Sequence, residues 1–132
     1  MTANKPAKLS VLVIDDDEEI RTTLRDVLED NGFTADCAAN GRVALDMLLR
    51  DESTPALILL DLTMPEMDGW MFRKEQQKVA RLAQIPVVLF SGHLDAARSA
   101  LSLNAAAIMT KPLRLDGLVT LIDQLSRRGK AN

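Results

Sequence analysis

Residues 56–69 have the sequence ALILLDLTMPEMDG, in which an unbroken apolar run passes directly into an aspartate. Pro55 interrupts the chain just before this run, and a proline and a glycine follow the aspartate, as is typical of a turn. A short, continuous apolar run is typical of a strand buried on both faces of a parallel sheet, because helices cover such a sheet on each side. We therefore expect Ala56–Leu60 to form a central strand that ends at Asp61.

Short apolar runs and stretches with helical spacing alternate along the rest of the chain. Further strands are expected at Leu9–Ile14, Phe33–Ala38, Pro86–Phe90 and Ala106–Thr110. Apolar residues at helical spacing predict helices at residues 20–28, 41–50, 70–80, 95–103 and 115–125. Repeated strand-helix units of this kind predict an α/β fold, with a parallel sheet between two layers of helices.

Length and composition favour a single domain, which we place at residues 9–126 between tails at residues 1–8 and 127–132. Lys and Arg total 16 against 19 Asp and Glu, so no basic excess favours binding to nucleic acid or to an anionic membrane. No apolar run approaches the ~20 residues that cross a bilayer, and no signal peptide is recognisable. Because Cys37 is the single cysteine, an internal disulfide is excluded, and these features together favour a cytoplasmic protein.

Polar residues follow several of the expected strands. The acids Asp15–Asp17 follow the first strand, Asp61 the third, Ser91 the fourth and Lys111 the fifth. In open α/β sheets, ligands bind outside the carboxyl ends of the strands, so these side chains should meet at one edge. Each also has an ordinary interpretation: the acids as a helix start, Asp61 as a turn former, Ser91 as a helix N-cap and Lys111 as a solvated loop residue.

Taken together, these side chains predict a phosphoryl-transfer site. Carboxylates that converge on one edge repel one another unless a cation lies among them. Oxygen ligands without neighbouring His or Cys select Mg²⁺, Mn²⁺ or Ca²⁺ over zinc. A carboxylate can also act as a nucleophile and form an aspartyl-phosphate, whose charge an ammonium, a hydroxyl and a metal would neutralise.

The chain resembles the receiver domain of two-component response regulators from about Leu9 to Leu125. The resemblance rests on four motifs in the family's order, which are VIDDD at residues 13–17, LDLTMPEMDG at 60–69, FSGH at 90–93 and TKPL at 110–113. It implies a doubly wound, five-stranded parallel sheet of order 2-1-3-4-5 flanked by five helices, the flavodoxin-like or CheY-like fold. This strand order comes from the family resemblance and not from the residue pattern.

The resemblance also implies a metal site and a phosphoacceptor. Asp61 is then the phosphoacceptor. Asp16 and Asp61 are direct ligands of Mg²⁺, for which Mn²⁺ can substitute, and the backbone carbonyl of Thr63 is a third ligand. Asp15 is an outer partner that holds a metal-bound water.

The remaining implied roles concern the switch and its partners. Ser91 is the switch hydroxyl, and Lys111 pairs with Asp61 or with its phosphoryl group. The bond from Lys111 to Pro112 is cis, as in the family. The implied donor is a histidine kinase or a phosphotransfer protein. The output is a downstream protein that binds the face made by the fourth helix, the fifth strand and the fifth helix. We expect a monomer or weak dimer that contacts neither nucleic acid nor membrane directly, and that is a phosphoacceptor rather than an enzyme acting on other substrates.

Several positions depart from the family pattern. Ile108 lies where receivers usually carry an aromatic residue coupled to the switch hydroxyl, so the usual readout is altered. Arg73 and Gln76 occupy positions that are usually apolar, and the consecutive residues 70–72, Trp-Met-Phe, cannot all face the core. The segment from Ser91 to Lys111 is also shorter than usual. His93 is either a solvated loop residue or a side chain beside the path of attacking water.

Three other functions were weighed against phosphorylation. A pseudo-receiver, which binds partners without phosphorylation, is favoured by Ile108 and opposed by the complete set of acids, hydroxyl and lysine. A phosphatase with an aspartate nucleophile would need a second aspartate where Thr63 stands. A flavin site would need a phosphate-binding loop after the first strand, where this chain has three acids.

Overall fold

The computed structural model describes residues 9–50, 54–92, 103–111 and 114–130, and its strands form one parallel sheet of order β2-β1-β3-β4-β5. The strands are β1 (Ser10–Ile14), β2 (Thr34–Ala38), β3 (Leu57–Asp61), β4 (Val87–Ser91) and β5 (Ala107–Thr110). The helices are α1 (Glu18–Asp30), α2 (Gly41–Arg50), α3 (Gly69–Gln77), α4 (Ala80–Ala83) and α6 (Leu115–Lys130). The expected strand order and the α/β fold are confirmed.

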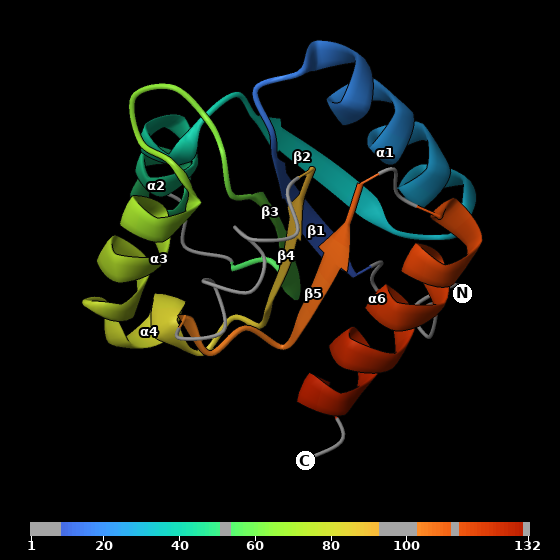
Figure 1. The fold of residues 1–132 in the computed structure, drawn as a ribbon. Helices are drawn as coiled ribbons and strands as arrows, with labels where there is room; N and C mark the ends of the chain where they lie inside the picture. Colours follow the sequence, from blue (N-terminus) through green and yellow to red (C-terminus); the bar gives the residue numbers. More distant parts are fainter. Residues whose placement is uncertain (1–8, 51–53, 93–102, 112–113, 131–132) are drawn as a thin grey trace.

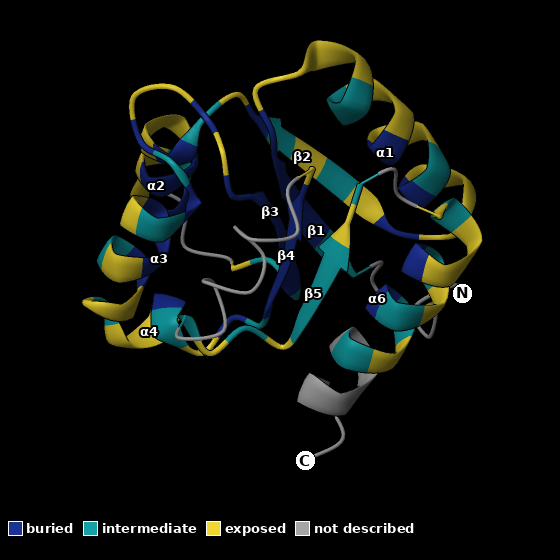
Figure 2. Ribbon diagram, in the orientation of Figure 1, coloured by how far each residue is buried: buried dark blue, intermediate teal, exposed yellow. Residues whose placement is uncertain are grey.

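Figure 1 shows α2, α3 and α4 on one face of the sheet and α1 and α6 on the other. Alternate residues of the central strands pack towards these two layers. Leu12 and Leu60 pack in the cluster that includes buried residues of α2, α3 and α4. Val13 and Leu59 pack in the cluster that includes buried residues of α1 and α6. All five residues of β3 are buried, which explains why its sequence is a continuous apolar run rather than an alternating one (Figure 2).

The predicted first and last residues agree well with the structure for the strands and for the first two helices. The helix expected at residues 41–50 is α2, with the same limits. The first helix ends at Asp30, and Gly32 follows with φ 90°, a left-handed conformation that glycine adopts readily. The helix expected at residues 95–103 lies almost entirely outside the described residues.

Two helix predictions were wrong in their limits. Residues 70–80 are not one helix: α3 ends at Gln77, Val79 is extended with φ −110° and ψ 114°, and α4 begins at Ala80. The buried side chain of Gln76 donates to the carbonyls of Leu82 and Ile85, so the chain turns back around it. The final helix continues to Lys130, past the expected end at Leu125, because the polar residues there do not stop a helix. Among the described residues, no helix is both long enough and apolar enough to cross a membrane.

Gly69 allows the loop after β3 to pack against the end of that strand. Its backbone N–H donates to the carbonyl of Leu62 at 3.0 Å. A Cβ at this position would lie 2.8 Å from the carbonyl oxygen of Asp61 and 2.8 Å from the Cα of Leu62. Both are backbone atoms, so relief would require the loop to move away from Asp61.

We expect Gly69→Ala to lower the free energy of unfolding by ~2 kcal/mol, as overpacking against backbone does. Gly117→Ala is the matched control, because a Cβ at Gly117 meets nothing within 4 Å. That substitution in α6 should raise the free energy of unfolding by roughly 0.5 kcal/mol, since alanine loses less backbone entropy. Urea unfolding followed by circular dichroism measures both, and equal effects of the two substitutions would contradict the account of Gly69.

Candidate functional site

Three carboxylates meet at the carboxyl ends of the two central strands. Asp15 follows β1 directly and Asp61 is the last residue of β3, and these strands pair in the register Ile14 with Leu60. One carboxylate oxygen from each of Asp15, Asp16 and Asp61 lies within 4.8 Å of the others. Asp15 and Asp61 are buried whereas Asp16 is exposed, so the cluster is closed on its inner side and open on its outer side.

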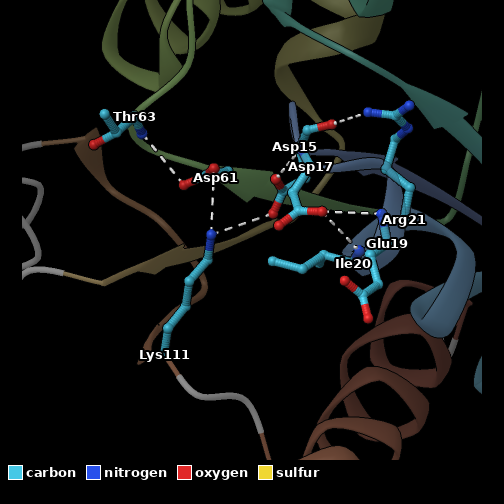
Figure 3. Close-up of polar contacts among 8 residues, drawn as sticks. All are labelled: Asp15, Asp17, Glu19, Ile20, Arg21, Asp61, Thr63 and Lys111. Carbon is cyan, nitrogen blue, oxygen red and sulfur yellow. Dashed lines mark hydrogen bonds and ion pairs between the residues drawn. The ribbon is translucent and has the colours of Figure 1, made fainter.

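Lys111 reaches into the same cluster from the end of β5 (Figure 3). Its Nζ lies 3.3 Å from Oδ2 of Asp15 and 3.4 Å from Oδ2 of Asp61. The same nitrogen lies 5.2 Å from the centre of the Phe90 ring, within the range of a cation–π contact. The backbone N–H of Lys111 donates to the carbonyl of Ser91 at 2.8 Å, which joins the chain after β5 to the end of β4.

Burial raises the pKa of both inner carboxyls, Asp15 and Asp61. Burial raises the pKa of Asp61 to about 6, and the Asp15 carboxylate acts in the same direction, against the smaller lowering effect of Lys111. Burial also raises the pKa of Asp15, although the N–H of Asp17 and the ammonium of Lys111 oppose it. Burial alone would lower the pKa of Lys111, but the carboxylates of Asp15 and Asp61 raise it above its ordinary value. The ammonium of Lys111 thus compensates the negative charge of Asp15 and Asp61 only in part.

Backbone and arginine contacts hold the inner carboxylates in place. Oδ1 of Asp15 accepts from the N–H of Asp17 at 2.8 Å, and Oδ1 of Asp61 accepts from the N–H of Thr63 at 3.3 Å. Arg21 donates from Nη1 to the backbone carbonyl of Asp15 at 2.8 Å (Figure 3). The sequence analysis missed Arg21, because a bond from a side chain to a main-chain carbonyl leaves no pattern in the sequence.

The acidic run after β1 divides into site residues and an ordinary helix cap. The side chain of Asp17 accepts from the N–H groups of Glu19 at 2.9 Å and Ile20 at 3.4 Å, so it is the N-cap of α1. Asp15 and Asp16 instead belong to the carboxylate cluster. The interpretation of the run as a helix start is therefore correct for Asp17, and the role of Asp15 and Asp16 as site residues stays a prediction.

The other predicted residues have distinct surroundings. Ser91 is the last residue of β4, is buried, and pairs in register with Thr110. Thr63 is exposed, and Ile108 is half-buried against the cluster beneath α2, α3 and α4. Of the three consecutive large residues, Met71 is the exposed one, as expected for one of them. His93 and Pro112, and with Pro112 the predicted cis bond, lie outside the described residues.

The set of donors fits a hard divalent cation. Its side-chain ligand atoms are carboxylate oxygens, which Mg²⁺ and Mn²⁺ prefer, and two of them belong to buried groups whose pKa is raised chiefly by burial. The exposed Asp16 leaves an open side, as Mg²⁺ needs to keep some of its waters. Asp15, Asp16 and Asp61 are the side chains that could hold such an ion.

Comparison with known proteins identifies the family. A family model for the response regulator receiver domain matches residues 11–123, so the chain belongs to the receiver domain family. It is 32% identical over 127 residues to the response regulator Rre1 of Synechocystis sp., covering 94% of this chain and 54% of that protein. It is also 32% identical over 122 residues to the sensor histidine kinase CheAY of Helicobacter pylori, covering 90% of this chain and 15% of that protein. The chain therefore spans about half, or less, of the length of these relatives.

Solved structures agree with this assignment. The receiver domain of the Francisella response regulator 1452 has a TM-score of 0.81 at 27% identity, covering 92% of this chain and 98% of that one. The receiver domain of a signal transduction histidine kinase from Syntrophus aciditrophicus has a TM-score of 0.84 at 27% identity, covering 93% of each chain. The chain thus has the receiver fold over nearly its whole length.

The raised pKa of Asp61 predicts how stability depends on pH without metal. The folded state holds a proton on Asp61 up to about pH 6, whereas the unfolded chain releases it near pH 3.8. The folded state binds more protons between these values, so stability should fall as pH rises from about 4 to about 7. We expect this fall to be larger in the wild type than in Asp61→Asn, by up to ~3 kcal/mol. Urea unfolding in EDTA at several pH values measures the difference, and parallel pH profiles would contradict it.

Proposed function

We propose that Asp61 accepts a phosphoryl group from the phosphohistidine of a histidine kinase or phosphotransfer protein, in a Mg²⁺-dependent reaction, and that phosphorylation changes partner binding. The observation that carries this proposal is the convergence of Lys111 Nζ on the buried carboxylates of Asp15 and Asp61, beside the exposed Asp16. Membership of the receiver family supports it. A donor of this kind would place the chain in the cytoplasm.

In this proposal, each acid has a different task. Asp16 and Asp61 would hold the ion directly, together with the backbone carbonyl of Thr63, and Asp15 would support it from outside as an indirect partner. When bound, the ion neutralises the negative charge that the acids and the phosphoryl oxygens bring together.

The transfer step requires little from the protein beyond position and charge. A carboxylate oxygen of Asp61 forms the new bond to phosphorus as the bond from phosphorus to the imidazole nitrogen breaks, and that nitrogen keeps the electron pair and takes a proton. The ammonium of Lys111 stays protonated, as its raised pKa requires, and pairs with a phosphoryl oxygen. The hydroxyl of Ser91 donates to another phosphoryl oxygen. The chain is thus a phosphoacceptor that promotes its own modification, not an enzyme with a separate product.

The change in partner binding would follow from the negative charge that the phosphoryl group brings to the site. The phosphoryl group carries about −1.5 to −2 charges, which replace the single charge of the Asp61 carboxylate beside the buried carboxylate of Asp15. Ser91 and Lys111 are joined by a backbone hydrogen bond, so a change at either one is passed to the ends of both β4 and β5. A downstream protein would then bind the face that includes β5 and α6, with an affinity that depends on phosphorylation.

A second function, a pseudo-receiver that binds partners without phosphorylation, is supported by one observation. Ile108 is half-buried at the position that would carry the switching aromatic, and an aliphatic side chain cannot repeat the movement of an aromatic ring. A pull-down that compares phosphorylated protein with Asp61→Ala separates the two functions. Identical partners for both proteins would favour the pseudo-receiver.

Acetyl phosphate with Mg²⁺ should add the mass of one phosphoryl group to the wild-type protein. The gain should be absent in Asp61→Asn and in wild type treated with EDTA, because the nucleophile or the ion is then missing. Asp36→Asn is the matched control, since Asp36 is an exposed aspartate on the edge strand β2 and should be dispensable. Intact mass spectrometry measures the gain. The proposal fails if folded wild type gains nothing, or if Asp61→Asn gains as much as wild type.

Lys111→Met should slow phosphorylation by roughly 10²–10³-fold, the usual effect of removing one preorganised group that stabilises charge in the transition state. Lys78→Met is the control, because Lys78 is an exposed lysine that pairs with Glu75 away from the acidic cluster. Initial rates with acetyl phosphate, from quenched samples and intact mass, measure both. A loss of less than threefold for Lys111→Met would remove the lysine from the mechanism.

A further inference from the structure

Arg73 and Gln76 form a buried polar pair in α3. Arg73 is 5% exposed and Gln76 is fully buried. Nη1 of Arg73 donates to Oε1 of Gln76 at 2.8 Å, so the two side chains act as one unit. Burial lowers the pKa of the Arg73 guanidinium, which shows that holding this charge inside the protein is costly.

The pair joins two segments that are far apart in the sequence. Arg73 donates from Nε to the carbonyl of Leu103 at 2.9 Å and from Nη2 to the carbonyl of Asn104 at 3.1 Å. Gln76 donates to the carbonyls of Leu82 at 2.8 Å and Ile85 at 3.2 Å. One segment leads into β5 and the other leads into β4. The pair therefore fixes the amino-terminal ends of these neighbouring strands relative to each other.

β5 is a short strand at the edge of the sheet. It has four residues, none of them fully buried, and among the described residues its strand partner is β4. Ala107, Ile108 and Met109 pack against the two core clusters. The register of β5 on β4 is bounded by two backbone bonds of 2.8 Å, from the N–H of Ala106 to Val87 and from the N–H of Lys111 to Ser91. A shift of this strand would carry Lys111 away from the carboxylates, since Lys111 follows its last residue directly.

We infer that Arg73, supported by Gln76, is a positioning residue for Lys111: it holds the backbone that enters β5 and so fixes the strand that brings the ammonium to Asp15 and Asp61. Packing alone does not require an arginine here, because an apolar side chain would fill the space without a buried charge. The planar fork of the guanidinium is suited to the task, since it can bond two successive carbonyls and Gln76 at once. The part of the inference that concerns rate rests on the proposed function, whereas the part that concerns the strand does not.

Amide hydrogen exchange measured by NMR tests the effect on the strand. In Arg73→Met, which keeps an unbranched apolar side chain but no donors, the amides of Ala106 and Lys111 should exchange about tenfold faster than in wild type. The amide of Asp15, which donates to Ala38 on the other side of the sheet, should keep its rate. Arg81→Met is the matched control, because Arg81 donates to the carbonyl of Leu48 in α2 and does not contact β5. It should leave Ala106 and Lys111 unchanged.

Two exchange results would overturn the inference. Faster exchange at Ala106 without any change at Lys111 would confine the role of Arg73 to the turn that it touches. Equal acceleration at Asp15, Ala106 and Lys111 would make it a contributor to global stability alone. If Arg73→Met does not fold, Arg73→Lys serves instead, since it keeps the charge but not the fork. The same two amides should then accelerate by a smaller factor.

A double-mutant cycle tests the effect on the reaction. Arg73→Met should slow phosphorylation by acetyl phosphate roughly threefold to tenfold, because a misplaced ammonium stabilises the transferred group less well. In the background of Lys111→Met, the same substitution should have no further effect, because the group that it positions is absent. Equal slowing in both backgrounds would overturn the inference. If wild type is not phosphorylated at all, the proposed function fails, and the exchange experiment still decides the role of Arg73.

Discussion

The repulsion between the buried carboxylates of Asp15 and Asp61 is the constraint on which the site depends. Two neighbouring strands force these groups together, and the fully buried residues Ile14 and Leu60, paired in register just before them, leave no freedom to separate. The electrostatic repulsion between the two carboxylates can be reduced by a proton, by the ammonium of Lys111 or by a divalent ion. Burial raises the pKa of both acids as well, and Lys111 opposes this shift without cancelling it. The sheet holds the two carboxylates close together, and the site therefore attracts positive charge.

The position of each group relative to solvent decides how that affinity can be used. The inner side is closed by the sheet and by Lys111, while Asp16 faces water. An ion or a phosphoryl donor can therefore approach from the side of Asp16, and the ammonium of Lys111 lies within 3.4 Å of both inner acids. The backbone N–H of Lys111 also donates to Ser91. The residue whose ammonium contacts Asp61 therefore also links the ends of β4 and β5.

The sequence predicted the sheet and the acidic cluster because both depend on local patterns. Runs such as Leu57–Leu60 identify strands buried on both faces, and the edge rule for open sheets then brings Asp61 and Lys111 together. The break at Val79 and the contacts of Arg73 could not be predicted in this way. The bond from Arg73 to Leu103 spans 30 residues, and it depends on how α3 lies against the chain before β5. The sequence marked Arg73 and Gln76 only as polar residues in apolar positions, which shows where to look but not what they bind.

The two ends of β5 are held by different kinds of interaction, and this difference bears on how a signal could travel. At its amino-terminal end, neutral carbonyls bond a guanidinium whose partners do not change with the charge on Asp61. At its carboxyl-terminal end, Lys111 is held by the carboxylates that phosphorylation would alter. If Asp61 is phosphorylated as proposed, the change in force acts on the carboxyl-terminal end while the other end stays fixed. Ile108 lies between the two and cannot swing as an aromatic ring does. In this chain the response is therefore expected in the backbone near Ser91 and Lys111, rather than in a side-chain flip at Ile108.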